Sequence, residues 1–92
     1  MNRKELAQTI ARESDLTVAQ AEAAVTIALD SIVEAVADGE AVVLTGLGTF
    51  ERRHRAARSG RNPQTGEAIK IAASNAPAFK PAAGFKRLVA GR

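Results

Sequence analysis

The first third of the chain carries apolar residues at the spacing of an α-helix. The first such repeat consists of Leu6, Ala7, Ile10 and Ala11. It predicts a helix over about residues 3–13, because residues three and four apart share one helix face. Asn2 and Glu5 have the spacing of a capping box at its start. The next residues, Ser14, Asp15 and Leu16, interrupt the repeat and end the predicted helix.

A second, longer helix is predicted after this interruption. Thr17 and Gln20 form another capping pattern, and Gly39 suits the position just after the helix end. The apolar stripe between them consists of Ala21, Ala24, Val25, Ala28, Leu29, Ile32, Val33 and Val36. The two helices should form a hairpin, in which the short helix cannot cover the whole stripe. Spacing alone leaves two interpretations equally open, a dimer interface and burial beneath a sheet.

The pattern then changes to the alternation of β-strands. Residues 41–45 predict a short strand, 46–48 a tight turn, and 49–55 a second strand. In the second strand Phe50, Arg52 and His54 share one face, and Glu51, Arg53 and Arg55 share the other. Neither face is apolar beyond Phe50, so the strand should leave the core there. We therefore expect residues from about 53 to 73 to project as a two-stranded ribbon.

The chain should return from the ribbon into a closing strand and a last helix. Pro77, Phe79 and Pro81 close the sheet, and Pro81 suits the first position of a helix over 82–90. The apolar residues expected to dock that helix are Phe85, Leu88 and Val89. The predicted fold class is α+β: an N-terminal helical hairpin, a three-stranded antiparallel sheet with a long protruding arm, and a short C-terminal helix.

Composition supports one small domain over residues 1–92. We divide it into 1–45 (helices and first strand), 46–79 (sheet with the arm) and 80–92 (last helix). Hydrophobic residues make up 46% of the chain and aromatic residues 3%, so the core is aliphatic and barely sufficient for a chain of this size. There is no cysteine, which excludes disulfides and thiolate sites. The charged N-terminus and the absence of a long apolar run predict a protein that is neither secreted nor inserted into a membrane, and the absence of cysteine favours the cytoplasm.

The net charge of +3 conceals two halves of opposite sign. Up to Glu51 the chain has three basic and nine acidic residues, a net charge of −6. From Arg52 onward it has ten basic residues and one acidic residue, Glu67, a net charge of +9. Such asymmetry indicates that the second half faces a polyanion. Nucleic acid is the first candidate and an anionic membrane surface the second.

No pattern in the chain predicts an enzyme, a cofactor, a metal or a small-molecule substrate. The glycines at 46 and 48 are not followed by a helix that would make them a nucleotide-binding loop. His54 is the only histidine and has no cysteine to join it in a metal site. The acidic residues are spread along the helices, which is typical of solvated faces.

The order of elements and the run GLGTFERRHRAARSGRNPQTGEAIKIAASNAPAFKPAAGFKRLV (46–89) resemble the bacterial HU family of histone-like DNA-binding proteins, relatives of integration host factor. The resemblance covers essentially the whole chain. It implies an intertwined homodimer whose two arms enter the minor groove of double-stranded DNA and bend it, as is known for architectural proteins of this family. It also implies a nucleoid-associated protein that condenses DNA and prefers bent, nicked or kinked duplexes.

The resemblance assigns DNA contacts to the arm and to a flank of the dimer. The predicted arm contacts are Arg53, Arg55, Arg58, Arg61, Asn62, Pro63 and Gln64, and the predicted flank contacts are Arg3, Lys80 and Lys86. Pro63 is interpreted as a wedge between base pairs, although a turn proline is the simpler interpretation without the family. The chain reads FKPAAGFK where the family pattern is FKPGKxLK, so Ala83 replaces a usual lysine and should weaken flank binding.

Two function classes remain open from the sequence. The first is a DNA-binding protein that bends and compacts duplex DNA with little sequence preference. The second is a structural partner that docks on RNA or on an acidic protein surface through its ribbon. Within the first class, a subunit of a sequence-specific heterodimer of the integration-host-factor type is also open. Arginine-rich arms without a base-reading helix favour the nonspecific type.

Overall fold

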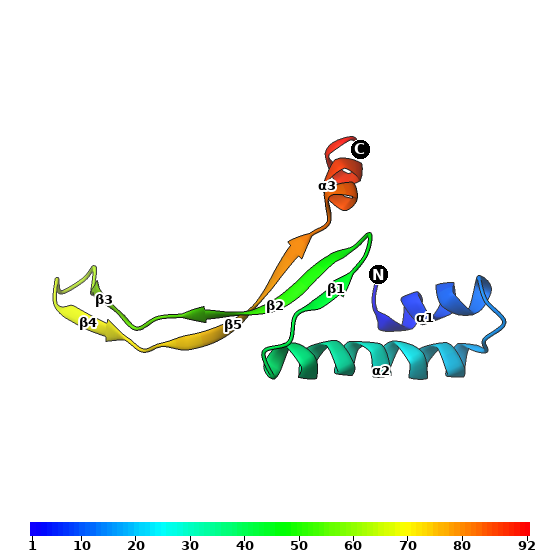
Figure 1. Cartoon of the computed structure of the whole chain (residues 1–92), viewed down its shortest axis with the longest axis horizontal. Helices are drawn as coiled ribbons and strands as arrows, with labels where there is room; N and C mark the ends of the chain where they lie inside the picture. Colours follow the sequence, from blue (N-terminus) through cyan, green and yellow to red (C-terminus); the bar gives the residue numbers. More distant parts are fainter. The chain divides into compact units, whose positions relative to one another are not determined.

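The computed structural model describes all residues from Met1 to Arg92. Its elements in chain order are α1 (Arg3–Arg12), α2 (Val18–Ala37), β1 (Val42–Leu44), β2 (Gly48–Arg55), β3 (Arg58–Arg61), β4 (Ala68–Ile71), β5 (Ser74–Pro81) and α3 (Ala83–Ala90) (Figure 1). The chain divides into two compact units, Met1–Ala35 and Val36–Arg92, which are described separately. The predicted order of helices and strands is confirmed.

Both N-terminal helices begin with the predicted caps. In α1 the side chain of Asn2 accepts a hydrogen bond from the backbone N–H of Glu5 at 2.8 Å. In α2 the capping is reciprocal: the N–H of Gln20 donates to Thr17 Oγ1 at 3.1 Å, and the N–H of Thr17 donates to Gln20 Oε1 at 2.9 Å. These bonds satisfy N–H groups that have no partner inside the helix, so the local sequence sets where each helix begins.

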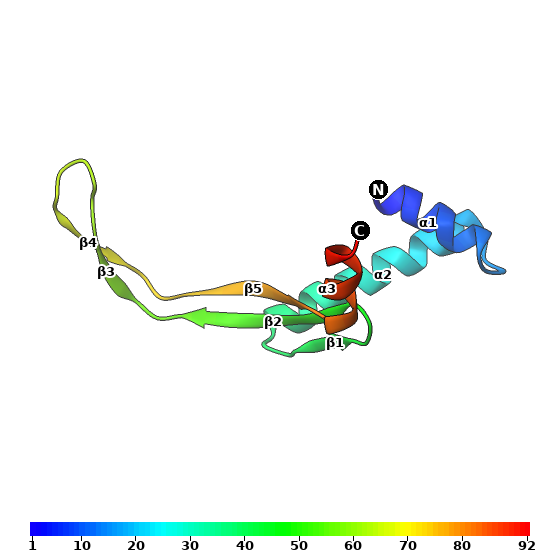
Figure 2. The ribbon, with the colours of Figure 1, turned by 90° about the horizontal axis from the view of Figure 1, so that it is seen from above.

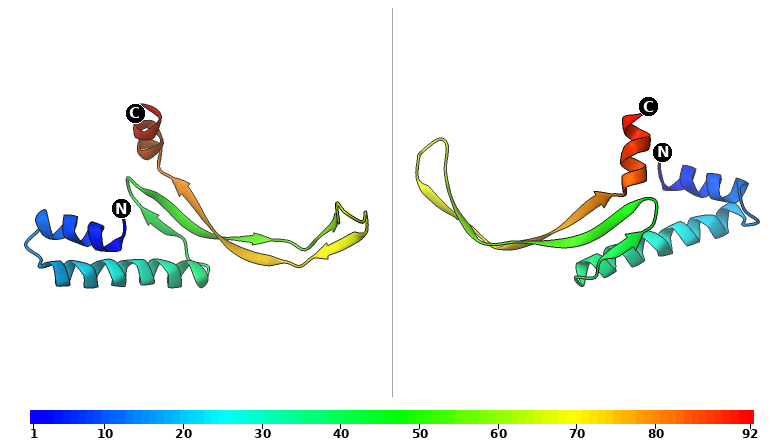
Figure 3. Two further views of the ribbon diagram at one scale, coloured as in Figure 1. Left: turned by 180° about the vertical axis from the view of Figure 1, so that it is seen from behind. Right: turned by 45° about the horizontal axis from the view of Figure 1, so that its top comes forward.

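The helical hairpin has a small core. Ala7 and Ala21 are fully buried and Val25 almost so, with Ile10, Ala11 and Leu29 packed around them. Alanines at the contact allow the two backbones to approach closely, and the two helices lie side by side (Figure 3). Farther along α2, Val33, which belongs to the predicted stripe, keeps 66% of its surface exposed. The short helix therefore covers only part of the stripe, as the sequence predicted. No helix has both the length and the hydrophobicity that a membrane span requires.

The second unit is built on an antiparallel sheet in the order β1-β2-β5. Phe50 lies opposite Phe79, and their ring centroids are 4.7 Å apart. Gly48 sits beside this pair with a φ of +155°. A Cβ at this position would lie 2.7 Å from Phe79 Cε1 and closer still to the carbonyl oxygen of Lys80, so the turn requires glycine there.

The sheet extends into a long arm made by β3 and β4 (Figure 2). Pairing is interrupted at residues 56–57 and 72–73, and the register is unchanged across the gap. The last pair before the gap is Arg55↔Ser74. The next pair, Arg58↔Ile71, lies three residues farther along on both strands. The sequence predicted a ribbon over about 53–73, and the structure has it as one ribbon in a single register.

The C-terminal helix differs from the prediction at its start. Pro81 is the last residue of β5 and pairs with Gly48, while α3 begins at Ala83 with Ala82 as its cap. The prediction that Pro81 is the first helical residue was wrong, because the strand pairing extends through it. Leu88 and Val89 remain 57% and 61% exposed. Their predicted docking is not made within this chain, and only Phe85 is partly buried.

Candidate nucleic-acid interface

The tip of the arm is a tight loop between Asn62 and Glu67. The N–H of Asn62 donates to the carbonyl of Glu67 at 2.8 Å, and the N–H of Gly66 donates to the carbonyl of Asn62 at 2.7 Å. The side chain of Asn62 accepts from the N–H of Gln64 at 2.9 Å, and Gly66 has a positive φ, +75°, which glycine adopts readily. Pro63 is held at the turn with its side chain exposed. An apolar ring without an N–H group is thus presented at the end of the ribbon.

The two faces of the outer arm differ in chemistry. Arg61 and Lys70 share one face, because Ser59 lies opposite Lys70 and the side chains of a strand alternate. The other face carries Arg58 together with Gly60 and the isoleucines Ile69 and Ile71, which are 45% and 37% exposed. A Cβ on Gly60 would lie 3.3 Å from Ile71 Cδ1, so the glycine leaves room for that side chain. The arm therefore has a cationic face and a mostly apolar one.

The unbroken register connects the cationic face to the base of the arm. Arg53, Arg55 and Arg61 are separated by even numbers of residues, and the register does not change between them. Their side chains therefore lie on the same face of the ribbon. Arg58 falls on the opposite face. The four arm arginines named from the sequence therefore all lie on the ribbon, but they do not form one row. Lys70, which was not among the predicted contacts, lies with Arg61.

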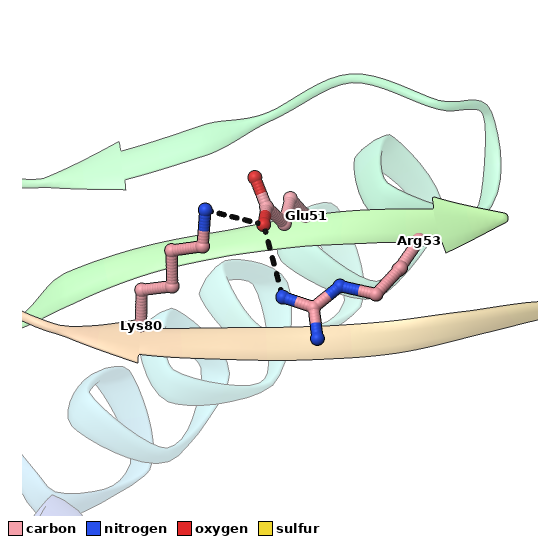
Figure 4. Close-up of polar contacts among 3 residues, drawn as sticks. All are labelled: Glu51, Arg53 and Lys80. Carbon is pink, nitrogen blue, oxygen red and sulfur yellow. Dashed lines mark ion pairs between the residues drawn. The ribbon is translucent and has the colours of Figure 1, made fainter.

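A cluster of three charged residues lies at the base of the arm (Figure 4). Glu51 Oε1 is 3.1 Å from Lys80 Nζ and 3.6 Å from Arg53 Nη2. The hydrogen bond and charge of Lys80, followed by the charge of Arg53, lower the pKa of the Glu51 carboxyl below its usual value. The side chains of Arg53 and Lys80 remain 54% and 64% exposed. Two predicted DNA contacts thus share one carboxylate and still face solvent.

The opposite face of the arm base has a structural role. Arg52 Nη1 donates to the carbonyl oxygen of Ala37 at 3.2 Å, at the end of α2. A Cβ on Gly39 would lie 2.9 Å from Arg52 Nη2, so the guanidinium lies directly over that glycine. His54 Nδ1 and Asn75 Oδ1 are 2.9 Å apart across the strands. Arg52 therefore caps a helix C-terminus, where a cation is favourable.

The predicted flank residues lie on separate elements. Arg3 is the first residue of α1 and is exposed. Lys80 lies near the end of β5, and Lys86 lies on α3 beside an apolar groove of about 410 Å³ that Phe79 and Phe85 also line. No group of three or more histidine, cysteine, aspartate or glutamate side chains is placed to hold a metal ion.

Sequence reasoning missed two features of this surface. The pairing of Glu51 with Lys80 depends on the register of β2 and β5, which places Thr49 opposite Lys80. The alternation of β2 had already put Glu51 and Arg53 on one face, but it carries no information about the partner strand. The second is Lys70, which the register of β3 and β4 places on the same face of the arm as Arg61.

The chain is thus an α+β protein whose small antiparallel sheet extends into an exposed ribbon with a cationic face. Comparisons with known proteins make this specific. Residues 1–90 match the family model described as "Bacterial DNA-binding protein". The chain is 48% identical to DNA-binding protein HU 1 of Bacillus subtilis over 92 residues, the full length of both. It is 53% identical to DNA-binding protein HU-alpha of Vibrio cholerae over 79 residues, 86% of this chain and 88% of the relative.

Solved structures give the same result. A chain of the Anabaena HU–DNA cocrystal structure superposes with a TM-score of 0.85 at 44% identity, over the full length of both chains. The V42I mutant of HU from Thermotoga maritima gives a TM-score of 0.70 at 27% identity, over 97% of this chain and 99% of that one. The chain therefore belongs to the HU family of bacterial DNA-binding proteins. This family is not one of enzymes, and membership does not favour the alternative of an RNA-binding or protein-docking module.

Proposed function

We propose that this protein is a nonspecific architectural protein of the bacterial nucleoid, in the cytoplasm, that binds, bends and compacts double-stranded DNA. The observation that carries the proposal is the exposed ribbon with a cationic face and Pro63 at its tip. Arginines on a ribbon reach phosphates and the electronegative floor of the minor groove with planar, multidonor groups. The minor groove shows a degenerate pattern of base edges, so such contacts read shape and charge more than sequence.

The proposed contacts are those of the arm and flank. On the arm they are Arg53, Arg55, Arg58, Arg61, Asn62, Pro63 and Gln64, and on the flank Arg3, Lys80 and Lys86. Pro63 inserts between two base pairs, because it is exposed, apolar and has no N–H to desolvate. Unstacking one step costs a few kcal/mol, which the added cationic contacts of a bent duplex offset. A duplex that is already bent, nicked or kinked lowers this cost and is bound preferentially.

The acting form is a homodimer. Only four hydrophobic residues of the single chain are buried, namely Ala7, Ala21, Val25 and Val36, and no large side chain is fully buried. A second copy covers the exposed apolar surface of α2 and α3, including Val33, Leu88 and Val89. The dimer brings two arms to one duplex, which is what bending between two insertion points requires.

Binding and bending can be separated by measuring end-to-end shortening of a labelled duplex by fluorescence energy transfer across a salt series. The wild type should shorten the duplex, and its log affinity should fall with log salt at a slope of about 0.9 per phosphate neutralised. Pro63→Ala should bind with a similar slope and bend less. Pro77→Ala, which removes an exposed proline away from the tip, is the matched control and should behave as wild type.

Each other outcome has a definite meaning. If Pro63→Ala bends DNA as the wild type does, Pro63 is only a turn residue. A salt-insensitive affinity, or a wild type that leaves the duplex length unchanged, contradicts the architectural function. In that case, competition between nicked duplex and A-form RNA shows whether RNA is the ligand.

A further inference from the structure

Arg52 lies where the sheet narrows from three strands to two. The last residue of β2 that pairs with β1 is Phe50, opposite Val42, whereas pairing with β5 continues through Arg52 to Arg55. From this point the arm is a two-stranded ribbon, and such ribbons twist more strongly and are less stable than wider sheets. The direction in which the arm leaves the sheet therefore depends on the contacts that its first residues make.

The guanidinium of Arg52 contacts the end of α2 at two points. Its Nη1 donates to the carbonyl oxygen of Ala37 at 3.2 Å. Its Nη2 lies over Gly39, 2.9 Å from the position that a Cβ there would take. Gly39 has a φ of +91°, the left-handed conformation in which glycine commonly follows a helix end. A larger residue at position 39 would displace the guanidinium, so the contact requires both residues.

The end of α2 has no cation of its own. Its last turn contains no basic residue, and Glu34 and Asp38 place negative charge near the last carbonyl groups. A helix C-terminus favours positive charge, which Arg52 supplies from β2. Both ion pairs of the structure use Glu51, and neither includes Arg52. The hydrogen bond of Arg52 thus joins the first residues of the arm to a helix end fifteen residues earlier in the chain.

We propose that Arg52 is a positioning residue, whose contact with the end of α2 sets the direction in which the arm leaves the sheet. This inference rests on the proposed function, because the direction of the arm decides where Pro63 meets a duplex. An arm that is held in one direction before binding loses less conformational freedom on binding, which raises affinity. It also brings Pro63 to a reproducible position, so that bound duplexes have similar bends. In this role Arg52 acts through the helix end and does not contact DNA.

The first test measures end-to-end distances of single labelled duplexes by fluorescence energy transfer at saturating protein, and affinity across a salt series. Arg52→Gln should widen the distribution of distances and lower affinity by about fivefold, the effect of one ordinary hydrogen bond. It should leave the salt slope unchanged, because no phosphate contact is lost. Arg12→Gln is the matched control, since it removes the same charge from the last turn of α1 and should bend DNA as the wild type does.

A second pair of variants disturbs the contact and keeps the charge of Arg52. Gly39→Ala places a methyl group against the guanidinium and should widen the distribution as Arg52→Gln does. Gly46→Ala is its matched control: Gly46 has nearly the same φ, +89°, and nothing lies within 4 Å of the added Cβ apart from the residue's chain neighbours. Both alanines are strained and should lower stability, but only Gly39→Ala should alter bending. Combining Gly39→Ala with Arg52→Gln should add little, because both remove one contact.

The motion of the arm can also be measured without DNA. The chain has no cysteine, so a dye can be attached at Thr65→Cys in the tip of the arm. Time-resolved fluorescence anisotropy should show greater motion of the arm when Arg52→Gln is added to this protein. Equal motion with and without Arg52→Gln would overturn the inference. A wild type that does not shorten a duplex overturns the proposed function instead, and the anisotropy still decides the role of Arg52.

Two results with DNA would also overturn the inference. A lower salt slope for Arg52→Gln, together with normal bending by Gly39→Ala, would make Arg52 a phosphate contact. Normal bending by both variants, with a lower midpoint of urea unfolding, would make Arg52 only a cap of α2.

Discussion

Glu51 shows how one carboxylate can affect both the fold and the binding surface. Glu51 lies on β2 and links this strand to β5 through its ion pair with Lys80. It also forms an ion pair with Arg53, which lies on β2 as well. Both partners are largely exposed, so the pairs are screened by solvent and contribute modestly to stability. In the proposed complex, a DNA phosphate would replace this carboxylate as the partner of Lys80. The same two cations therefore have one partner in the free protein and another proposed partner in the complex.

The lowered pKa of Glu51 predicts the pH dependence of its contribution. Because the folded state favours the ionised carboxylate, the stabilisation is present above the ordinary glutamate pKa and is lost as the pH falls through the folded value. Glu51→Gln should therefore be less stable than wild type near neutral pH, and the difference should shrink in acid. Urea denaturation at a series of pH values down to about pH 3 measures this.

A suitable control for that comparison is Glu67→Gln, which removes the same charge from a side chain that makes no ion pair. A gap between wild type and Glu51→Gln that stays constant at every pH would show that Lys80 and Arg53 do not act through the ionised carboxylate.

At the scale of elements, the arm is the least self-sufficient part of the chain. Every residue of β3 and β4 is exposed except Gly60, which is partly buried. The residues between the inner and outer ribbon, at 56–57 and 72–73, form no ladder pair. A two-stranded ribbon without a core is marginally stable in water, so we expect this arm to open more readily than the three-stranded sheet.

Amide hydrogen exchange should show this difference within one molecule. Amides of residues 58–71 should exchange much faster than those of β2 and β5 around Phe50 and Phe79, because local opening of the outer arm exposes little buried apolar surface. Addition of duplex DNA should slow exchange in the arm. Equal protection of arm and sheet in the free protein would contradict this account.

At the scale of the whole molecule, the single chain lacks a core of ordinary size. Its fully buried residues are two alanines, and the larger apolar residues of α2 and α3 stay exposed. A chain of 92 residues, of which the arm contributes almost nothing to burial, is poorly self-sufficient by surface-to-volume scaling. This is the physical basis of the proposed homodimer.

A homodimer whose monomers are unstable has a stability that depends on concentration. The midpoint of thermal or urea unfolding should rise as the protein concentration is raised over about a hundredfold range. Sedimentation at the same concentrations gives the mass of the folded species. A midpoint that does not move over that range would mean that the single chain folds alone.

The sequence predicted most of the fold because local chemistry sets it. The two caps, the glycine turns and the change from helical to alternating periodicity are each written within a few residues. The start of α3 was misplaced because Pro81 satisfies local rules for a helix start, whereas strand pairing with Gly48 decides its place. The site was predicted residue by residue through resemblance. Its arrangement into two faces, and the Glu51 cluster, depend on cross-strand register, which no local pattern contains.

The single register of the arm limits how its length can change. A residue inserted into one strand would shift every pair beyond it, and one residue added to each strand would exchange the two faces of the tip. Only additions or deletions of two residues on each strand keep Arg61 and Lys70 on the side of Arg53 and Arg55. The reach of the arm along a duplex can therefore be lengthened or shortened only in discrete steps, and engineered versions of different span should be built in those steps.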